Sequence, residues 1–161
     1  IIAPTETGAW ERARRILAVT DFSRLGNAAV PLAYAVAEPN ATLHIAHVVS
    51  ARERTPLDFH DIFALDNPAL PSAPRDEAIE RLRALLPQGP STEGKHAQLH
   101  VLESDNHAEA IAQAAERLHV DLVVIGTHGR SGLSKALLGS VVSSLLGLTK
   151  RPILLAREAA L

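Results

Sequence analysis

The chain has 161 residues, of which 47% are hydrophobic, and a formal net charge of −2 at pH 7; this suits one domain with a buried core rather than two. Cysteine is absent, which excludes disulfides, thiol nucleophiles and thiolate metal sites. Scattered basic residues and an aromatic content of 3% disfavour DNA and RNA as partners. The sequence shows neither an apolar run long enough to span a membrane nor a start that resembles a signal peptide, so we expect a cytoplasmic protein.

The first part of the chain alternates apolar runs with helical sequence. Residues 15–20, RILAVT, are typical of a strand buried on both faces, and the run ends at Asp21. From Asn27 on, AAVPLAYAVA predicts a helix capped by Asn27, in which Pro31 would cause a kink or a delayed start. Residues 41–49, ATLHIAHVV, predict the second strand.

A proline-rich connection over about 50–74 follows, with room for one turn of helix at 59–64. Residues 75–86 then have apolar positions spaced as one face of an amphipathic helix. A third strand is predicted at 98–103, after a turn rich in glycine, proline and serine.

The last part of the chain gives the clearest pattern, a helix over 106–118 that begins with the capping pair Asn106 and Glu109. The remaining predicted elements are a strand at 121–125, a helix at 140–148 and a strand at 152–156. This alternation predicts an α/β fold: an open, mostly parallel five-stranded sheet with helices on both faces. We expect an N-terminal extension over 1–13 and a single domain over 14–161.

Glycines mark a candidate ligand site after the fourth strand. Gly126 and Gly129 allow positive φ values and close approach of a ligand to the backbone. Gly139 and Ser140 stand where the last helix should begin, and the free N–H groups and macrodipole of a helix start favour an anion. Arg130 adds a cation to the same segment. Spacing alone leaves an ordinary turn and a helix-terminus glycine as an equal alternative.

Neither common phosphate motif fits this segment. A dinucleotide fingerprint requires G-x-G-x-x-G after the first strand, and a P-loop requires Gly-Lys-Ser/Thr at a helix start. However, the pattern G-x2-G-x9-G-S of Gly126, Gly129, Gly139 and Ser140 resembles the ATP-binding signature of the universal stress protein family. RILAVTDFS, LHIAHVV, DLVVIGTHGRSG and RPILLA also fall in that family's order, so the resemblance covers almost the whole chain after about Arg14.

The resemblance implies a Rossmann-like, adenine nucleotide alpha-hydrolase-like fold and a bound adenine nucleotide: ATP, or AMP or ADP, with Mg²⁺. Asp21, with Thr20 before it, would approach the adenine, and the backbone of Val48 would meet the base. Asp21 could instead cap the first helix.

On the phosphate side, the resemblance implies that the signature glycines contact ribose or phosphates. Ser140 and the amide of Val141 would hold the phosphate end. His128 and Arg130 occupy variable positions of the loop and are weaker candidates for phosphate contact.

Histidines offer little support for a metal site. His44 and His47 lie three apart on a predicted strand and should face opposite sides of the sheet. His60 lies beside acidic residues in the long connection, where surface charge explains it. For hydrolysis, Asp21 could neighbour Mg²⁺ and His128 could act as a base, but neither assignment completes a catalytic set.

We therefore expect an ATP-binding regulatory module of the stress response, with at most slow ATPase activity. One alternative is an ATP-hydrolysing or adenylate-handling enzyme, although the SGGxDS and HxGH signatures of such enzymes are absent. Another is a dimeric interaction protein that does not use nucleotide. The family often dimerises through its last strand, and the short apolar PILLA would be an edge that needs covering, so we expect a homodimer.

Overall fold

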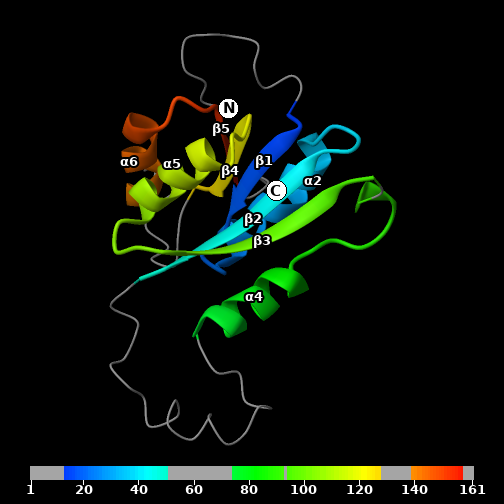
Figure 1. Ribbon diagram of the computed structural model, residues 1–161, viewed down its shortest axis with the longest axis horizontal. Coiled ribbons are helices and arrows are strands. Elements are labelled where there is room, and N and C mark those ends of the chain that lie inside the picture. The colour runs from blue at the N-terminus through cyan, green and yellow to red at the C-terminus, as the bar shows by residue number, and fades with distance from the viewer. Residues whose placement is uncertain (1–12, 51–73, 93, 128–138, 158–161) are drawn as a thin grey trace, which may run out of the picture.

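The computed structural model describes residues 13–50, 74–92, 94–127 and 139–157. In this part of the chain, parallel strands form one five-stranded sheet in the order β3-β2-β1-β4-β5 (Figure 1). The strands are β1 (Arg15–Val19), β2 (Thr42–Val49), β3 (His96–Glu103), β4 (Leu122–Gly126) and β5 (Ile153–Ala156). The predicted α/β fold is confirmed.

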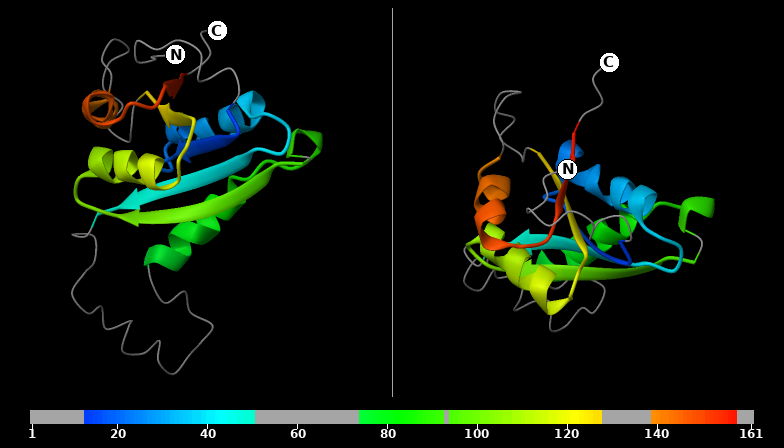
Figure 2. Two further views of the ribbon diagram at one scale, coloured as in Figure 1. Left: turned by 45° about the horizontal axis from the view of Figure 1, so that its top comes forward. Right: turned by 90° about the horizontal axis from the view of Figure 1, so that it is seen from above.

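Helices cover both faces of the sheet. They are α1 (Arg24–Asn27), α2 (Ala29–Val36), α4 (Pro74–Ala84), α5 (His107–Arg117) and α6 (Ser140–Leu148), with a 3₁₀ turn, η2, at Pro90–Thr92. Helices α2 and α4 pack on one face, and α5 and α6 on the other, as two views of the ribbon show (Figure 2). No helix among the described residues is long and apolar enough to cross a membrane.

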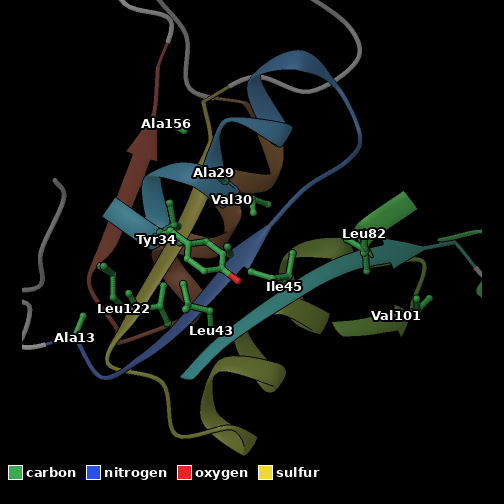
Figure 3. Close-up of a cluster of buried hydrophobic side chains, with 14 of the residues drawn as sticks. Ala13, Ala29, Val30, Tyr34, Leu43, Ile45, Leu82, Val101, Leu122 and Ala156 are labelled. Carbon is green, nitrogen blue, oxygen red and sulfur yellow. The ribbon is translucent and has the colours of Figure 1, made fainter. Parts of the chain in front are cut away.

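Alternation along the strands divides the core into two layers. Ile16 and Ala18 of β1 point to the layer under α2 and α4, whereas Leu17 and Val19 point to the layer under α5 and α6. Tyr34 of α2 lies against the sheet in the first layer (Figure 3). Because β1 is buried on both sides, its uninterrupted apolar sequence is what a central parallel strand requires.

The first helical segment starts earlier than the sequence predicts. Ser23, not Asn27, is the N-cap, and its side chain accepts a hydrogen bond from the Gly26 N–H. Asn27 instead accepts a hydrogen bond from the Thr20 hydroxyl at 2.7 Å. The segment is interrupted at Ala28, between α1 and α2. The start at Asn27 was therefore wrong, and the interruption agrees with the kink expected near Pro31, which has no N–H to offer the preceding turn.

Other element boundaries agree closely with expectation. The capping pair of α5 is confirmed: the Glu109 N–H donates to Asn106 Oδ1 at 3.2 Å, and Asn106 Nδ2 donates to Glu109 Oε2 at 3.3 Å. Strand β3 starts two residues before its predicted start and α4 ends two residues before its predicted end. The turn of helix expected at 59–64 lies outside the described residues.

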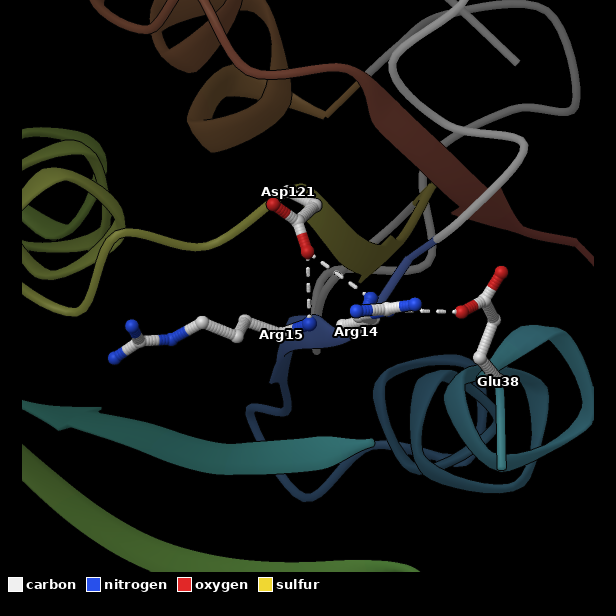
Figure 4. Close-up of polar contacts among 4 residues, drawn as sticks. All are labelled: Arg14, Arg15, Glu38 and Asp121. Atoms are coloured by element: carbon white, nitrogen blue, oxygen red, sulfur yellow. Dashed lines mark hydrogen bonds and ion pairs between the residues drawn. The ribbon is translucent and has the colours of Figure 1, made fainter. Parts of the chain in front are cut away.

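An acidic side chain fixes the N-terminal end of the sheet. Asp121 Oδ2 accepts hydrogen bonds from the backbone N–H groups of Arg14 at 3.0 Å and Arg15 at 2.9 Å (Figure 4). The Arg14 side chain pairs with Glu38 at 3.1 Å. Asp121 therefore joins the starts of β1 and β4, which sets the register of the two strands whose opposite ends carry the candidate site.

Candidate functional site

The candidate site lies at the carboxyl ends of β1 and β4. From β1 the chain continues to β2 and β3 on one side, and later to β4 and β5 on the other. Open α/β sheets bind their ligands at such a reversal of winding. Apart from Val48 near the end of β2, the predicted site residues should therefore lie in three segments: the one after β1, the end of β4 and the start of α6.

Thr20 is used by the turn that follows β1. Its N–H donates to the Ala46 carbonyl at 3.0 Å, its hydroxyl donates to Asn27, and the same hydroxyl accepts from the Phe22 N–H at 2.9 Å. Only 2% of the residue is exposed. Thr20 therefore shapes the turn that carries Asp21, and its contact with a nucleotide stays a prediction.

Asp21 organises the start of α1. Its Oδ1 accepts hydrogen bonds from the Ser23 N–H at 3.0 Å and from the Ser23 hydroxyl. Because the Ser23 hydroxyl in turn accepts from the Gly26 N–H at 3.1 Å, Asp21 supports the cap without being the cap. A Cβ at Gly26 would lie 2.2 Å from Asp21 Oδ1, so a side chain there would displace the carboxylate from its present position. Neither Ser23 nor Gly26 was predicted; a serine three residues before a glycine was the available signal.

Gly126 makes room for the protein's own backbone. A Cβ at this position would lie 2.8 Å from the Leu25 carbonyl oxygen and 3.0 Å from the Gly26 nitrogen. Among the described glycines, positive φ values occur at Gly89 and Gly94, not at Gly126. Gly126 does not use the positive φ that glycine allows; instead, its missing side chain lets α1 pack directly on the end of β4.

The start of α6 lies beside the end of β4. The Gly139 N–H donates to the Thr127 carbonyl at 3.0 Å, and the Thr127 N–H donates to the Ala156 carbonyl at 3.1 Å. Gly139 is the N-cap, no side chain caps the helix, and its first turn contains no acidic residue. Ser140 is exposed and Val141 half-buried, and the first N–H groups of any helix have no acceptor within it. His128, Gly129 and Arg130 lie outside the described residues.

Val48 could meet a ligand only through its backbone. Its side chain is 6% exposed and belongs to the layer under α5 and α6. The Ala46 carbonyl, two residues earlier, points to the β1 side, where it accepts from Thr20. Because backbone groups alternate along a strand, the N–H and C=O of Val48 also point to that side, just past the end of β1.

A stack of three side chains beside Asp21 was not predicted. Phe22 has a φ of 62°, which is rare for a bulky residue. Its ring centroid lies 4.2 Å from that of His47, and the Arg81 guanidinium carbon lies 3.9 Å from the ring centroid. His47 Nδ1 lies 2.8 Å from the Thr20 carbonyl oxygen, which can only accept, so Nδ1 carries the proton. Helix α4 is thereby connected to the turn that holds Asp21.

The predicted opposite orientation of His44 and His47 is confirmed. His47 packs on Phe22, which belongs to the layer under α2 and α4. His44 contacts His100, on the face where its strand neighbours Ala46 and Val48 belong to the layer under α5 and α6. One metal ion cannot bind both side chains through the sheet. His60 lies outside the described residues.

Comparisons with known proteins bear on the family and the fold. The sequence model of the universal stress protein family matches residues 12–157. The chain is 34% identical over 137 residues to universal stress protein A homolog 1 of Coxiella burnetii, covering 83% of this chain and 88% of that protein. The structure is also similar to that of protein MJ0577 of Methanocaldococcus jannaschii, with a TM-score of 0.66, 22% identity and coverage of 91% of this chain and 98% of that one.

A further solved structure is that of a universal stress protein in complex with cAMP. It has a TM-score of 0.58 and 20% identity, and the match covers 90% of this chain and 97% of that one. At these identities the solved structures establish a common fold.

Proposed function

The chain belongs to the universal stress protein family, and from this premise we propose that it is a nucleotide-dependent regulatory module of the stress response that binds ATP, or AMP or ADP. The observation that carries the proposal is the start of α6, which has no acidic residue in its first turn and lies against the end of β4.

The phosphate end of the nucleotide would lie on the first turn of α6. The N–H groups of Ser140 and Val141, the Ser140 hydroxyl and the positive end of the helix dipole favour a polyphosphate. Gly139 would allow close approach from the N-cap position. We extend the proposal to Gly129 on the sequence signature, and to its neighbours His128 and Arg130 at variable positions of the same loop, with Arg130 adding a charge-assisted contact. Mg²⁺, which prefers phosphate oxygens and water, would arrive with the nucleotide.

The adenine end would lie past the end of β1. There the backbone of Val48 offers one donor and one acceptor to the edge of the base, and Asp21 adds a carboxylate held by Ser23. Thr20 would act only through the turn it stabilises. The structural relative in complex with cAMP supports an adenine nucleotide as the ligand class.

Binding rather than rapid hydrolysis suits the described residues. Phosphoryl transfer to water needs a positioned base and a metal clamp on the phosphates. Asp21 is committed to Ser23, and the other candidate, His128, lies outside the described residues. We therefore propose ATPase activity that is slow at most.

A charge placed at the start of α6 tests the nucleotide site. Ser140→Asp would stabilise the helix through its dipole but repel a phosphate, so the melting temperature should hold or rise while affinity for MgATP falls at least about tenfold in isothermal titration calorimetry. Ser144→Asp, with the same charge one turn later on an exposed position, is the matched control and should bind like the unaltered protein.

Two further measurements complete the test. Gly129→Glu should also weaken MgATP binding, and mass spectrometry of the small molecule that copurifies should identify an adenine nucleotide. Equal MgATP affinity of Ser140→Asp and the unaltered protein would contradict the proposed site. Steady ADP formation at many turnovers per minute would favour the enzyme alternative instead.

A further inference from the structure

A pair of histidines lies under helix α5, away from the proposed nucleotide site. His44 Nδ1 of β2 lies 3.0 Å from His100 Nε2 of β3, and the ring centroids are 5.1 Å apart. His44 is only 2% exposed. Among the described residues, its Nε2 is buried and has no hydrogen-bond partner. The two residues are called the His44–His100 pair below.

When both rings are neutral, one placement of their protons is favoured. If His44 Nδ1 carries its proton, it donates to His100 Nε2, and the buried His44 Nε2 remains a bare acceptor. If His100 Nε2 donates instead, the proton of His44 must sit on Nε2, as a buried N–H without an acceptor. The first arrangement is favoured, because a buried donor without a partner carries a large desolvation cost.

Protonation of either ring of the pair is unfavourable. A proton on His44 occupies Nε2 and creates a buried N–H without a partner. A proton on His100 either sets two N–H groups against each other across 3.0 Å or moves the His44 proton to Nε2. Each outcome destabilises the contact between β2 and β3.

Nearby charges add to this effect. Arg15 at the start of β1 lowers the pKa of His44, and Arg117 at the end of α5 lowers that of His100, in each case after burial as the main cause. The Arg15 side chain points away from Asp121, whose carboxylate bonds backbone N–H groups (Figure 4).

Carboxylates of α5 have other partners among the described residues. Glu109 accepts from Asn106 and Gln113, and Glu116 pairs with Arg151. Helix α6 and strand β4 contribute no charged side chain to this face. A protonated His44–His100 pair would therefore meet cations and no identified compensating anion.

We propose that the His44–His100 pair is an acid-sensitive contact, which holds β2, β3 and α5 together at neutral pH and weakens their association in mildly acidic solution. Helix α5 packs against both strands and His44 is buried in β2, so loss of this contact loosens the edge of the sheet. The inference does not depend on nucleotide binding.

The direction of the pH effect follows from proton linkage. Burial, then His100 and Arg15, lowers the pKa of His44 from 6.5 to about 4. The unfolded chain therefore binds more protons than the folded protein between these values. Stability is full above about pH 6.5 and is lost as the pH falls toward 4, by up to about tenfold in the folding equilibrium constant per pH unit and per histidine.

Denaturant unfolding at pH 7 and pH 5, in buffer containing a chelator, tests the proposal. The unaltered protein should lose at least about tenfold in its folding constant at pH 5, and the double variant His44→Ile/His100→Ile should lose clearly less. His96→Gln, which removes an exposed histidine from the same strand, is the matched control and should keep the full loss. An equal pH effect in the double variant and the unaltered protein would overturn the proposal.

Imidazole NMR of the unaltered protein gives a second test that needs no variant. His44 should stay neutral down to pH 5, with its proton on Nδ1. Titration of both His44 and His100 near 6.5 would refute the inference. So would stabilisation by Zn²⁺ that the double variant lacks, since the rings would then be metal ligands.

Discussion

At the scale of single residues, the glycines show that a correct position can have an unexpected reason. Spacing pointed to Gly126 as a place where a ligand could approach the backbone, and in the structure the protein's own backbone lies there. The atoms that exclude the side chain belong to Leu25 and Gly26, which sequence spacing could not reveal because they lie about a hundred positions earlier in the chain. The family signature therefore includes at least one glycine whose immediate role is packing.

Gly126→Ala should destabilise the protein whether or not nucleotide is present. The new Cβ would lie 2.8 Å from the Leu25 carbonyl oxygen, and relieving such a contact should cost about 1 to 3 kcal/mol. Urea unfolding measures the change. Gly147→Ala is the control: nothing lies within 4 Å of a Cβ there, so this helical position should gain up to about 1 kcal/mol. Unchanged stability of Gly126→Ala would contradict the packing role.

At the scale of elements, the hydrophobic pattern predicted the strands and main helices, whereas capping residues did not predict where the first helix starts. The order and type of the strands and main helices followed from the alternation of apolar runs with amphipathic segments. The start of α1 did not, because four residues are too few to show a period. The stack of Phe22, His47 and Arg81 could not be predicted from the sequence either, because it joins three segments that only the folded sheet brings together.

Two substitutions at the start of α1 separate capping from ligand binding. Ser23→Ala removes the cap and should cost about 1 kcal/mol in the free energy of unfolding, while keeping the Asp21 carboxylate and its hydrogen bond from the backbone N–H of residue 23. Asp21→Ala should cost a similar amount and, if Asp21 contacts the adenine, also weaken MgATP binding. Calorimetric unfolding and titration of both variants give the comparison. Equal affinities in the two variants would leave Asp21 a purely structural role.

At the scale of the whole molecule, β5 is the edge through which we propose that two copies associate. The Ala156 carbonyl points toward β4, where it accepts from Thr127, so the backbone of Leu155 points to the opposite, outer side. In the described part of the chain, β5 pairs only with β4. Its outer N–H and C=O groups are suited to pairing with a second copy.

Leu155→Pro should abolish such a dimer while preserving the fold, because proline removes an outward N–H and spares the ladder to β4. Leu155→Ala shortens the side chain but keeps the N–H, so it should remain dimeric. Light scattering at micromolar concentration distinguishes the species. A monomeric unaltered protein would count against association through β5.

The central position of β1 governs how the chain can assemble during synthesis. Its partner β2 follows closely, but Arg15 and the Asp121 carboxylate that anchors it are 106 positions apart. Most of the polypeptide must leave the ribosome before the innermost strand gains its second neighbour. Until then β1 has a strand partner on one side only, and its other, apolar edge is unpaired. We expect the nascent chain to depend on chaperones at this stage.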